Sequence, residues 1–196
     1  YRRQPREDDT VMKGHQAKFA AALALLYFVA LWMSAPDIGF TRDEGYYFKA
    51  AEEYAGWWGV LISSNFLDAF SDATIRRFFE YNHEHPPLVK LTQGITYYIF
   101  HKWTGLTSPS QGFRVAGFLF GALGTWWTYR LGAELIDKTV GLAAAVFFVT
   151  IPRFFFDAHL ACFDVAITAM WTFSLLAYMR ALRATPARRW RTALWC

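Results

Sequence analysis

Two neighbouring acidic residues, Asp43 and Glu44, lie a few positions after the first long apolar block of the chain, residues 19–35. Adjacent carboxylates just above hydrocarbon are costly to hold unless they are solvated or used. A carboxylate in this place can accept a proton from an attacking hydroxyl group, or it can bind a cation. The structural alternative is a helix start, with Thr41 as its cap and the acidic pair favoured by the helix dipole. Both interpretations stay open on these residues alone.

A second polar group, His83, Glu84 and His85, is followed directly by two prolines and then by Lys90. Prolines force an extended approach and are well tolerated in a first helical turn, so the polar residues are expected in a fixed loop before a helix. Imidazole and carboxylate groups are zinc ligands, although this spacing fits no common zinc motif. Lys90 can pair with a phosphate as a point charge or extend towards lipid headgroups.

A third group lies at the ends of two later apolar blocks and contains Arg153, Asp157, His159 and Asp164. Asp164 precedes a long uncharged stretch, and an ionisable group at that depth is a functional candidate, with helix capping as the alternative. Arg114 begins another apolar block. Together with Arg153 and Lys90 it could bind a lipid phosphate at the membrane surface.

The composition indicates that lipid surrounds much of this chain. Of its 196 residues, 55% are hydrophobic and 19% are aromatic, whereas only 18% are charged. The apolar residues come in blocks rather than at the spacing of an element with one wet face. The two cysteines lie in or beside apolar segments, so we expect neither a disulfide framework nor a zinc site built on them. Because the chain lacks an initiator methionine and stops beside a basic run, we interpret it as a truncated fragment.

Four apolar blocks are candidates for membrane spans, since a transmembrane helix needs about 20 mainly apolar residues. We place these spans at residues 17–36, 113–132, 139–156 and 161–182. The first block could instead be a signal peptide, but an acidic segment follows it, which favours an uncleaved anchor. A fifth block, residues 86–103, is interrupted by polar side chains, and we expect an amphipathic helix on the outer membrane face.

The charge distribution predicts the orientation of these spans. Basic residues mark the cytoplasmic side, which places the N-terminal tail (residues 1–16) and the C-terminal segment (residues 183–196) inside. Four spans satisfy both constraints and leave residues 37–112 outside. Between positions 37 and 85 this loop has nine acidic and four basic residues with aromatic residues interleaved, as in amphipathic juxtamembrane helices. The predicted fold class is all-α, a polytopic transmembrane helix bundle with about four spans.

The order of these features resembles one family of enzymes. An Asp-Glu pair follows the first span, residues 85–90 read His-Pro-Pro-Leu-Val-Lys, Arg114 opens a span and Asp164 heads a later one. This order resembles the protein O-mannosyltransferases and their bacterial relatives, glycosyltransferases of the C type that use polyprenyl-phosphate sugars. The lipid A aminoarabinose transferases look like more distant cousins. The resemblance covers about residues 17–182, and residues 85–90 are its most specific part.

This resemblance implies roles for several residues. Asp43 matches the acidic residue proposed as the base that activates the acceptor hydroxyl, and Glu44 matches its partner. Arg114 and Asp164 match positions near the donor phosphate and the active site.

In the aminoarabinose branch, the positions of Glu84 and His85 are associated with metal and with phosphate respectively. Histidine is mostly neutral near neutral pH and is therefore a weaker phosphate ligand than lysine. This departure favours the mannosyltransferase-like branch and leaves a divalent metal as an open question, with no other cofactor expected.

We therefore expect a membrane glycosyltransferase that moves mannose or a related hexose from polyprenyl phosphate to an acceptor hydroxyl, with inversion. The acceptor could be a protein, a lipid or a glycan, and nucleic acid is not an expected partner. No glycine-rich phosphate loop follows a strand, and a lipid-phosphate donor needs no nucleotide fold. The resemblance to bacterial members predicts a multi-pass protein of the inner membrane with its active site on the periplasmic side.

Two rival functions remain at this point. A transporter or channel would have ionisable residues near the middle of the membrane and broken helices. A non-catalytic membrane partner would use the acidic, aromatic loop to bind another subunit. The clustering of charged residues at one face favours the enzyme over the transporter. The non-catalytic partner predicts instead that the side chains of Asp43, His85 and Asp164 do not converge in space.

Overall fold

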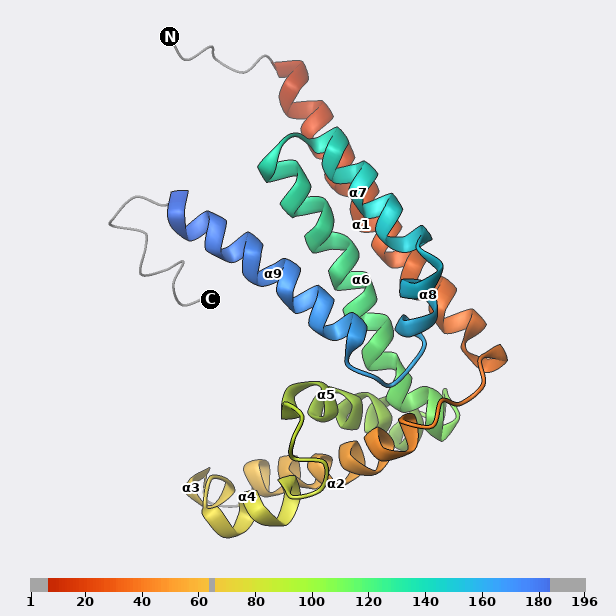
Figure 1. Ribbon diagram of the computed structural model, residues 1–196, viewed down its shortest axis with the longest axis vertical. Coiled ribbons are helices and arrows are strands. Elements are labelled where there is room, and N and C mark those ends of the chain that lie inside the picture. Colours follow the sequence, from red (N-terminus) through yellow and green to blue (C-terminus); the bar gives the residue numbers. More distant parts are fainter. Residues whose placement is uncertain (1–6, 64–65, 184–196) are drawn as a thin grey trace. The chain divides into compact units, whose positions relative to one another are not determined.

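The computed structural model describes residues 7–63 and 66–183 (Figure 1). Within these ranges every regular element is a helix, and in chain order they are α1 Glu7–Ser34, the 3-10 helix η1 Ala35–Asp37, α2 Glu44–Ser63, α3 Phe66–Ala69, α4 Asp72–Phe79, α5 Pro87–Tyr97, the π-helix η2 Tyr98–Trp103, α6 Pro109–Leu135, α7 Lys138–Thr150, α8 Pro152–Ala158 and α9 Asp164–Arg183. The predicted all-α class is thus confirmed for this part of the chain. Residues 1–6 of the predicted N-terminal tail, and the predicted basic segment beyond Arg183, lie outside the described residues.

The chain divides into two compact units. The first, here called the bundle unit, takes its described residues from 7–30, 120–155 and 164–183. The second, here called the site unit, consists of residues 31–119 and 156–163 and includes α2, α3, α4 and α5. Each unit has its own close packing.

In the bundle unit, two glycines allow α6 and α7 to pack backbone against backbone. A Cβ atom on Gly132 would lie 2.8 Å from the Cα atom of Gly141, so neither helix tolerates a side chain at this crossing. Next to it, Ala20, Tyr129 and Ala145 form a buried cluster. Small residues permit the close helix contacts that are common in membrane bundles.

Two of the described helices are long and apolar enough to cross a bilayer, Ala17–Asp37 and Asp164–Arg183. These correspond to the predicted first and fourth spans and support a helical membrane protein. The predicted second span lies in α6, which is not one of these two helices.

The predicted third span, residues 139–156, differs from the structure because it is two helices instead of one. Helix α7 ends at Thr150, Ile151 is extended, and α8 begins at Pro152, so that the pair is bent by 66°. Proline disfavours helical geometry in the residue before it, which explains the break at Ile151. The two helices together are apolar enough for one broken span.

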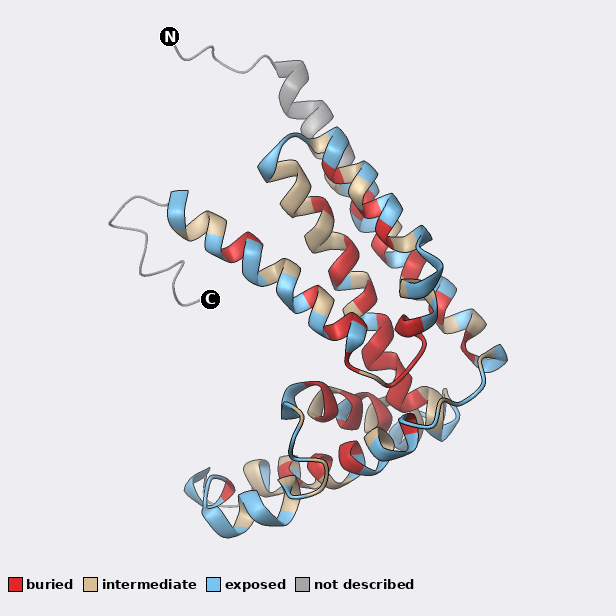
Figure 2. Cartoon of the chain, viewed as in Figure 1, coloured by how far each residue is buried: buried red, intermediate tan, exposed pale blue. Residues whose placement is uncertain are grey.

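In the site unit, α5 packs closely along α2. A Cβ atom on Gly94 of α5 would lie 2.6 Å from the carbonyl oxygen of Ala51 and 2.7 Å from the Cβ atom of Ala55. One turn further on, the rings of Tyr97 and Phe113 stack with centroids 4.1 Å apart. Figure 2 shows buried positions along both α2 and α5, and this packing holds the start of α2 against the first turns of α6.

Two buried aromatic side chains of α2 hold the short helices α3 and α4 by hydrogen bonds to their backbone and to the residues that follow. The indole Nε1 of Trp57 donates to the carbonyl oxygen of Ala69 at 2.8 Å. The hydroxyl of Tyr54 bonds to the carbonyl oxygens of Phe79 and Tyr81 at 3.3 and 3.0 Å. These contacts fix the chain as it leaves α4 and enters the loop that contains His83, Glu84 and His85.

Candidate active site

The two neighbouring carboxylates at the start of α2 have opposite environments. Glu44 is fully buried, whereas Asp43, one residue before the helix, is exposed. The carbonyl oxygen of Asp43 accepts hydrogen bonds from the N–H groups of Tyr46 and Tyr47 at 3.1 and 3.3 Å. The first turn of α2 therefore presents one carboxylate to the interior and the other to solvent.

Arg114 is the buried cation that pairs with Glu44, and its side chain is only 2% exposed. Its Nε and Nη2 atoms donate to the two carboxylate oxygens, each at 2.7 Å, in the bidentate geometry that suits this pair. The guanidinium also donates to the carbonyl oxygens of Ile38 and Gly39 at 3.0 and 2.7 Å. Four of its five N–H donors are thus used by protein oxygens.

Glu44 receives two further hydrogen bonds from backbone N–H groups. Thr41 donates to Oε2 and Ala161 donates to Oε1, both at 3.0 Å. The contact with Thr41 closes the turn that leads into α2, in which the N–H of Glu44 also donates to the carbonyl oxygen of Thr41 at 3.3 Å. The contact with Ala161 ties residues 156–163 to the same carboxylate. A glycine in α6 lets this segment approach, because a Cβ atom on Gly117 would lie 2.7 Å from the carbonyl oxygen of Ala158.

The carboxylate of Asp43, by contrast, makes no hydrogen bond or ion pair with the described residues. Its position is nevertheless restricted, since Glu44 and Thr41 on either side of it belong to the buried network. An accessible carboxylate on a fixed backbone is the arrangement that proton abstraction from a bound hydroxyl requires.

Lys90 in α5 is fully buried and holds the preceding loop. Its ammonium group donates to the hydroxyl of Tyr54 and to the carbonyl oxygen of His85, both at 3.2 Å, and makes a short hydrogen bond to the carbonyl oxygen of Asn82. These contacts use all three of its donors. Burial lowers the pKa of Lys90 to about 8, opposed by the nearby carboxylate of Glu84.

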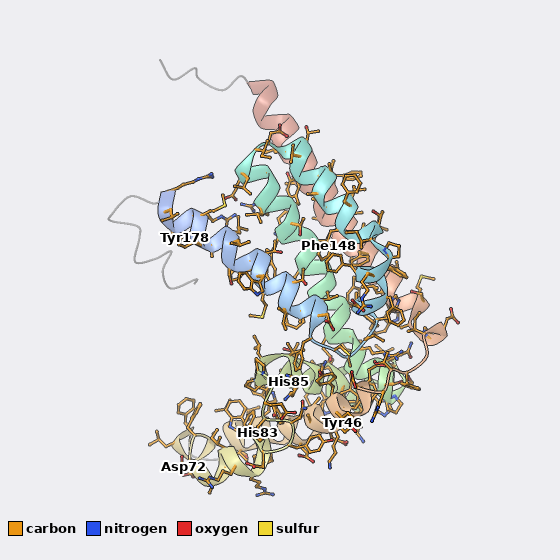
Figure 3. All side chains as sticks on the ribbon, in the orientation of Figure 1. Tyr46, Asp72, His83, His85, Phe148 and Tyr178 are labelled. Carbon is orange, nitrogen blue, oxygen red and sulfur yellow. The ribbon has the colours of Figure 1, made fainter. Side chains whose placement is uncertain are left out.

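The half-buried ring of His85 contacts one ring in the first turn of α2 and one in the segment before α9. Its centroid lies 4.9 Å from that of Phe163 and 6.1 Å from that of Tyr47, and the rings of Tyr47 and Phe163 are 4.8 Å apart. Figure 3 labels His85 on the loop between α4 and α5. The Pro-Pro loop therefore lies beside the helix that begins at the acidic pair.

The other polar residues of this loop have separate partners. Glu84 accepts a hydrogen bond from the side-chain amide of Asn82 at 2.8 Å. A backbone hydrogen bond lowers the pKa of Glu84, and the charges of His85, His83 and Lys90 add to the effect. The Nδ1 atom of His83 lies 2.8 Å from the carbonyl oxygen of Glu80. In the described part of the chain, no three His, Cys, Asp or Glu side chains are placed to hold a metal ion.

The remaining predicted site residues, Asp164 and Arg153, belong to the bundle unit. Asp164 is the exposed first residue of α9, and Arg153 is an exposed residue of α8. The structure brings Glu44 together with Arg114 and places Glu84, His85 and Lys90 around one loop. Its geometry says nothing about the roles of Asp164 and Arg153, which stay predictions.

Several residues that hold the site were not recognised in the sequence. They include Tyr54, which bonds to Lys90, and Ser34, whose Oγ atom lies 2.8 Å from Nε2 of the buried His159. The backbone N–H of Ala161 is another, since no side-chain pattern indicates a backbone donor. A tyrosine directly after two glutamates, Glu52 and Glu53, was the one signal available in the sequence, and such a signal is weak.

Comparison with known proteins identifies one family. The family model for dolichyl-phosphate-mannose-protein mannosyltransferase matches residues 84–196, which is more than half of the chain. The chain belongs to this family. It is thus a membrane glycosyltransferase of the mannosyltransferase type, and the predicted family is confirmed. No curated protein and no solved structure matches the chain.

The part of the chain that matches the mannosyltransferase family contains Glu84, His85, Lys90, Arg114, Arg153 and Asp164. It begins after Asp43 and Glu44. The buried ion pair connects the two parts, because Arg114 of the matched region binds Glu44 directly. The acidic pair is therefore a candidate for the active site on geometry rather than on the family match.

Proposed function

We propose that this mannosyltransferase transfers mannose or a related hexose from a polyprenyl-phosphate carrier to an acceptor hydroxyl, with inversion at the anomeric carbon. The observation that carries the proposal is the contrast between Asp43 and Glu44. Among the residues that the structure describes, one carboxylate is exposed and unpaired, and the next is held by four hydrogen bonds from Arg114, Thr41 and Ala161. A base has to be accessible and also fixed in place.

In the proposed reaction, the carboxylate of Asp43 takes the proton of the acceptor hydroxyl. The acceptor oxygen then forms its bond to the anomeric carbon as the bond from that carbon to the phosphate oxygen breaks. The lipid phosphate leaves with the bonding electron pair and stays in the membrane. Cationic groups that face this oxygen would supply the electrostatic part of catalysis.

Glu44 and Arg114 act as positioning residues in this proposal. The sequence suggested that Arg114 binds the donor phosphate directly, but four of its five donors already bind protein oxygens. A direct phosphate contact would have to break a buried ion pair, which is costly. The pair instead fixes the backbone on both sides of Asp43.

Lys90 acts as a positioning residue for the loop between α4 and α5. Its three donors hold the backbone of Asn82 and His85 and the hydroxyl of Tyr54, so we propose that it positions the loop instead of binding phosphate. His85, Glu84 and Arg153 remain candidates for contacts with the donor, and Asp164 remains a candidate for a second catalytic carboxylate. Their partial or full exposure is compatible with these roles.

For the topology we propose four spans, with residues 37–112 and the acidic pair at the external face of a bacterial inner membrane. Two apolar helices and the bent pair α7–α8 support this arrangement, and the arginines near the end of α9 support a cytoplasmic position for that end. A transporter would also have a broken helix such as α7–α8, but the family match favours the enzyme.

The test uses the full-length protein in membranes with radiolabelled polyprenyl-phosphate mannose. We expect label to move to an acceptor in the wild type and the rate to fall about 10²–10⁴-fold in Asp43→Ala, the usual contribution of a general base. Asp72→Ala is the matched control, because Asp72 is an exposed acid of the same unit on α4 (Figure 3). Near-normal transfer by Asp43→Ala would refute the base. No consumption of any polyprenyl-phosphate sugar would refute the reaction and favour a transporter.

A further inference from the structure

An open pocket of about 590 Å³ lies at the start of α2 and α6, within the site unit. Its size falls in the range of small-molecule sites, about 300–1,000 Å³. Three phenylalanines form its apolar walls and a few polar groups line its rim; these lining residues include Phe40, Phe48, Phe113, Thr41, Arg42 and Ser110. Asp43 stands in the sequence between two lining residues, Arg42 and Gly45.

The apolar walls are held in place by the surrounding rings. Phe48 and Phe113 stack with centroids 4.9 Å apart, and Phe113 stacks in turn on Tyr97. The ring of Phe40 lies edge-on to Phe48 at 6.3 Å, and the buried guanidinium of Arg114 lies 5.0 Å from its centroid. Phe40 is nevertheless 69% exposed, so a ligand that enters the pocket meets a preformed apolar surface.

Arg42 gives the pocket an available positive charge. It is exposed and makes no hydrogen bond or ion pair with the described residues, whereas Arg114 and Lys90 are buried and bound to protein oxygens. Arginine binds phosphate through two parallel N–H groups. The first turns of α2 and α6 add the partial positive charge of two helix starts.

A second observation at the same place indicates an absent partner. The hydroxyl oxygen of Thr41, which lines the pocket, is shielded from solvent and has no hydrogen-bond partner among the described residues. A shielded hydroxyl without a partner is unfavourable, and an oxygen-rich ligand in the pocket would supply one.

We infer that this pocket binds a lipid phosphate, with the phosphate on Arg42 and the first apolar carbons of the chain against Phe40, Phe48 and Phe113. The inference rests on the proposed function, because it makes Arg42 the cation that receives the leaving phosphate next to the base, Asp43. The same chemistry could come from polyprenyl phosphate or from a membrane phospholipid, and the experiment separates the two.

The experiment measures binding of radiolabelled polyprenyl phosphate, without sugar, to the full-length protein in nanodiscs. Arg42→Gln should weaken binding about 10- to 100-fold, the effect of losing a charge-assisted hydrogen bond, and Arg42→Lys should weaken it less. Arg76→Gln is the matched control, since Arg76 is an exposed arginine of α4 with no partner among the described residues. Its binding should stay within about twofold of the wild type, below the effect of one good hydrogen bond.

A second pair of variants tests whether the ligand occupies the pocket, without changing the charge of the protein. A Cβ atom at Gly45 or at Gly59, both exposed residues of α2, would meet nothing within 4 Å, so we expect the fold to accept Gly→Leu at either position. Gly45 lines this pocket, whereas Gly59 lines a separate apolar groove between α2, α5 and η2. Gly45→Leu should weaken binding at least about tenfold and Gly59→Leu should not, a difference of about 1.4 kcal/mol.

Unlabelled phosphatidic acid identifies the source of the ligand. If it displaces polyprenyl phosphate only at much higher concentration, the pocket belongs to the sugar carrier, and equal displacement assigns it to membrane phospholipids. If Arg42→Gln and Gly45→Leu both bind polyprenyl phosphate with the wild-type affinity, this pocket is not the lipid-phosphate site, and the proposed sugar transfer is unaffected. If the wild type binds polyprenyl phosphate but transfers no sugar, the proposed transfer is wrong and the lipid-phosphate pocket stands.

Discussion

Each unit contains a cluster of arginine and glutamate, and the two clusters differ in burial. In the site unit the side chains of Glu44 and Arg114 are 0% and 2% exposed, whereas in the bundle unit those of Glu134 and Arg180 are 25% and 40% exposed. Glu134 also binds Arg130 at 3.1 Å. Water can complete the shell of a half-exposed pair, but a buried pair has to find every donor and acceptor within the protein.

The geometry of the buried pair follows from that requirement. Glu44 accepts four hydrogen bonds, and two of them come from backbone N–H groups of separate segments. The bundle-unit cluster mainly joins the end of α6 to the end of α9. The buried pair Glu44–Arg114 thus fixes the backbone around it. The half-exposed pair Glu134–Arg180 is a weaker contact between two helices.

Removal of the buried cation should have the largest effect on stability. Arg114→Met leaves Glu44 as an uncompensated buried charge, so we expect a loss of about 3–5 kcal/mol in the free energy of unfolding. The double variant Glu44→Gln/Arg114→Met should recover most of this loss, because no charge is then left unpaired. Thermal unfolding of the single and double variants measures both effects, and a loss no larger than that of Arg180→Met would contradict the contrast between the clusters.

Replacement of Lys90 should have an intermediate effect of about 2 kcal/mol, since Lys90→Met leaves two carbonyl oxygens and a tyrosine hydroxyl without their donor. The burial that lowers the pKa of Lys90 from 10.5 to about 8 predicts a pH dependence. Between these values the unfolded chain binds more protons at this site, so this residue's contribution to stability rises with pH.

The stability difference between the wild type and Lys90→Met should therefore widen from pH 7 to pH 10. Chemical unfolding at several pH values provides the measurement, and Lys102→Met, at an exposed position of η2, is the control. A difference that is constant or narrows over this range would show that burial does not lower the pKa of Lys90 in the folded protein.

The smallest effect is expected at the half-exposed cluster. Arg180→Met should cost at most about 1 kcal/mol, as for most exposed ion pairs, and the cost should shrink in high salt because screening already weakens the pair. Thermal unfolding at low and high ionic strength tests this. A loss comparable to that of Arg114→Met, or one independent of salt, would mean that burial does not separate the two clusters.

Much of the fold was predictable because apolar blocks and helix signals are local. The helical class and the family were predicted and are confirmed, whereas the spans at residues 17–36 and 161–182 stay predictions that the apolar helices found there support. The break at Ile151 was missed, although Pro152 indicates it, because the apolar run continues past the proline and suggested one span.

The site was predicted less completely, since its contacts join distant residues. Glu44 and Arg114 were both singled out, but their pairing across 70 positions cannot be read from one sequence. Arg42 was assigned no role, although it stands directly before the acidic pair. Its availability became visible only when Arg114 was found to be the partner of Glu44.

The central claim is that Asp43 performs chemistry while Glu44 holds it in place. The most direct test measures sugar transfer and thermal stability together for Asp43→Asn and Glu44→Gln in the full-length protein. The account predicts that Asp43→Asn keeps the wild-type melting temperature and loses transfer, whereas Glu44→Gln lowers the melting temperature together with the rate. Transfer near the wild-type rate by a stable Asp43→Asn protein would contradict it.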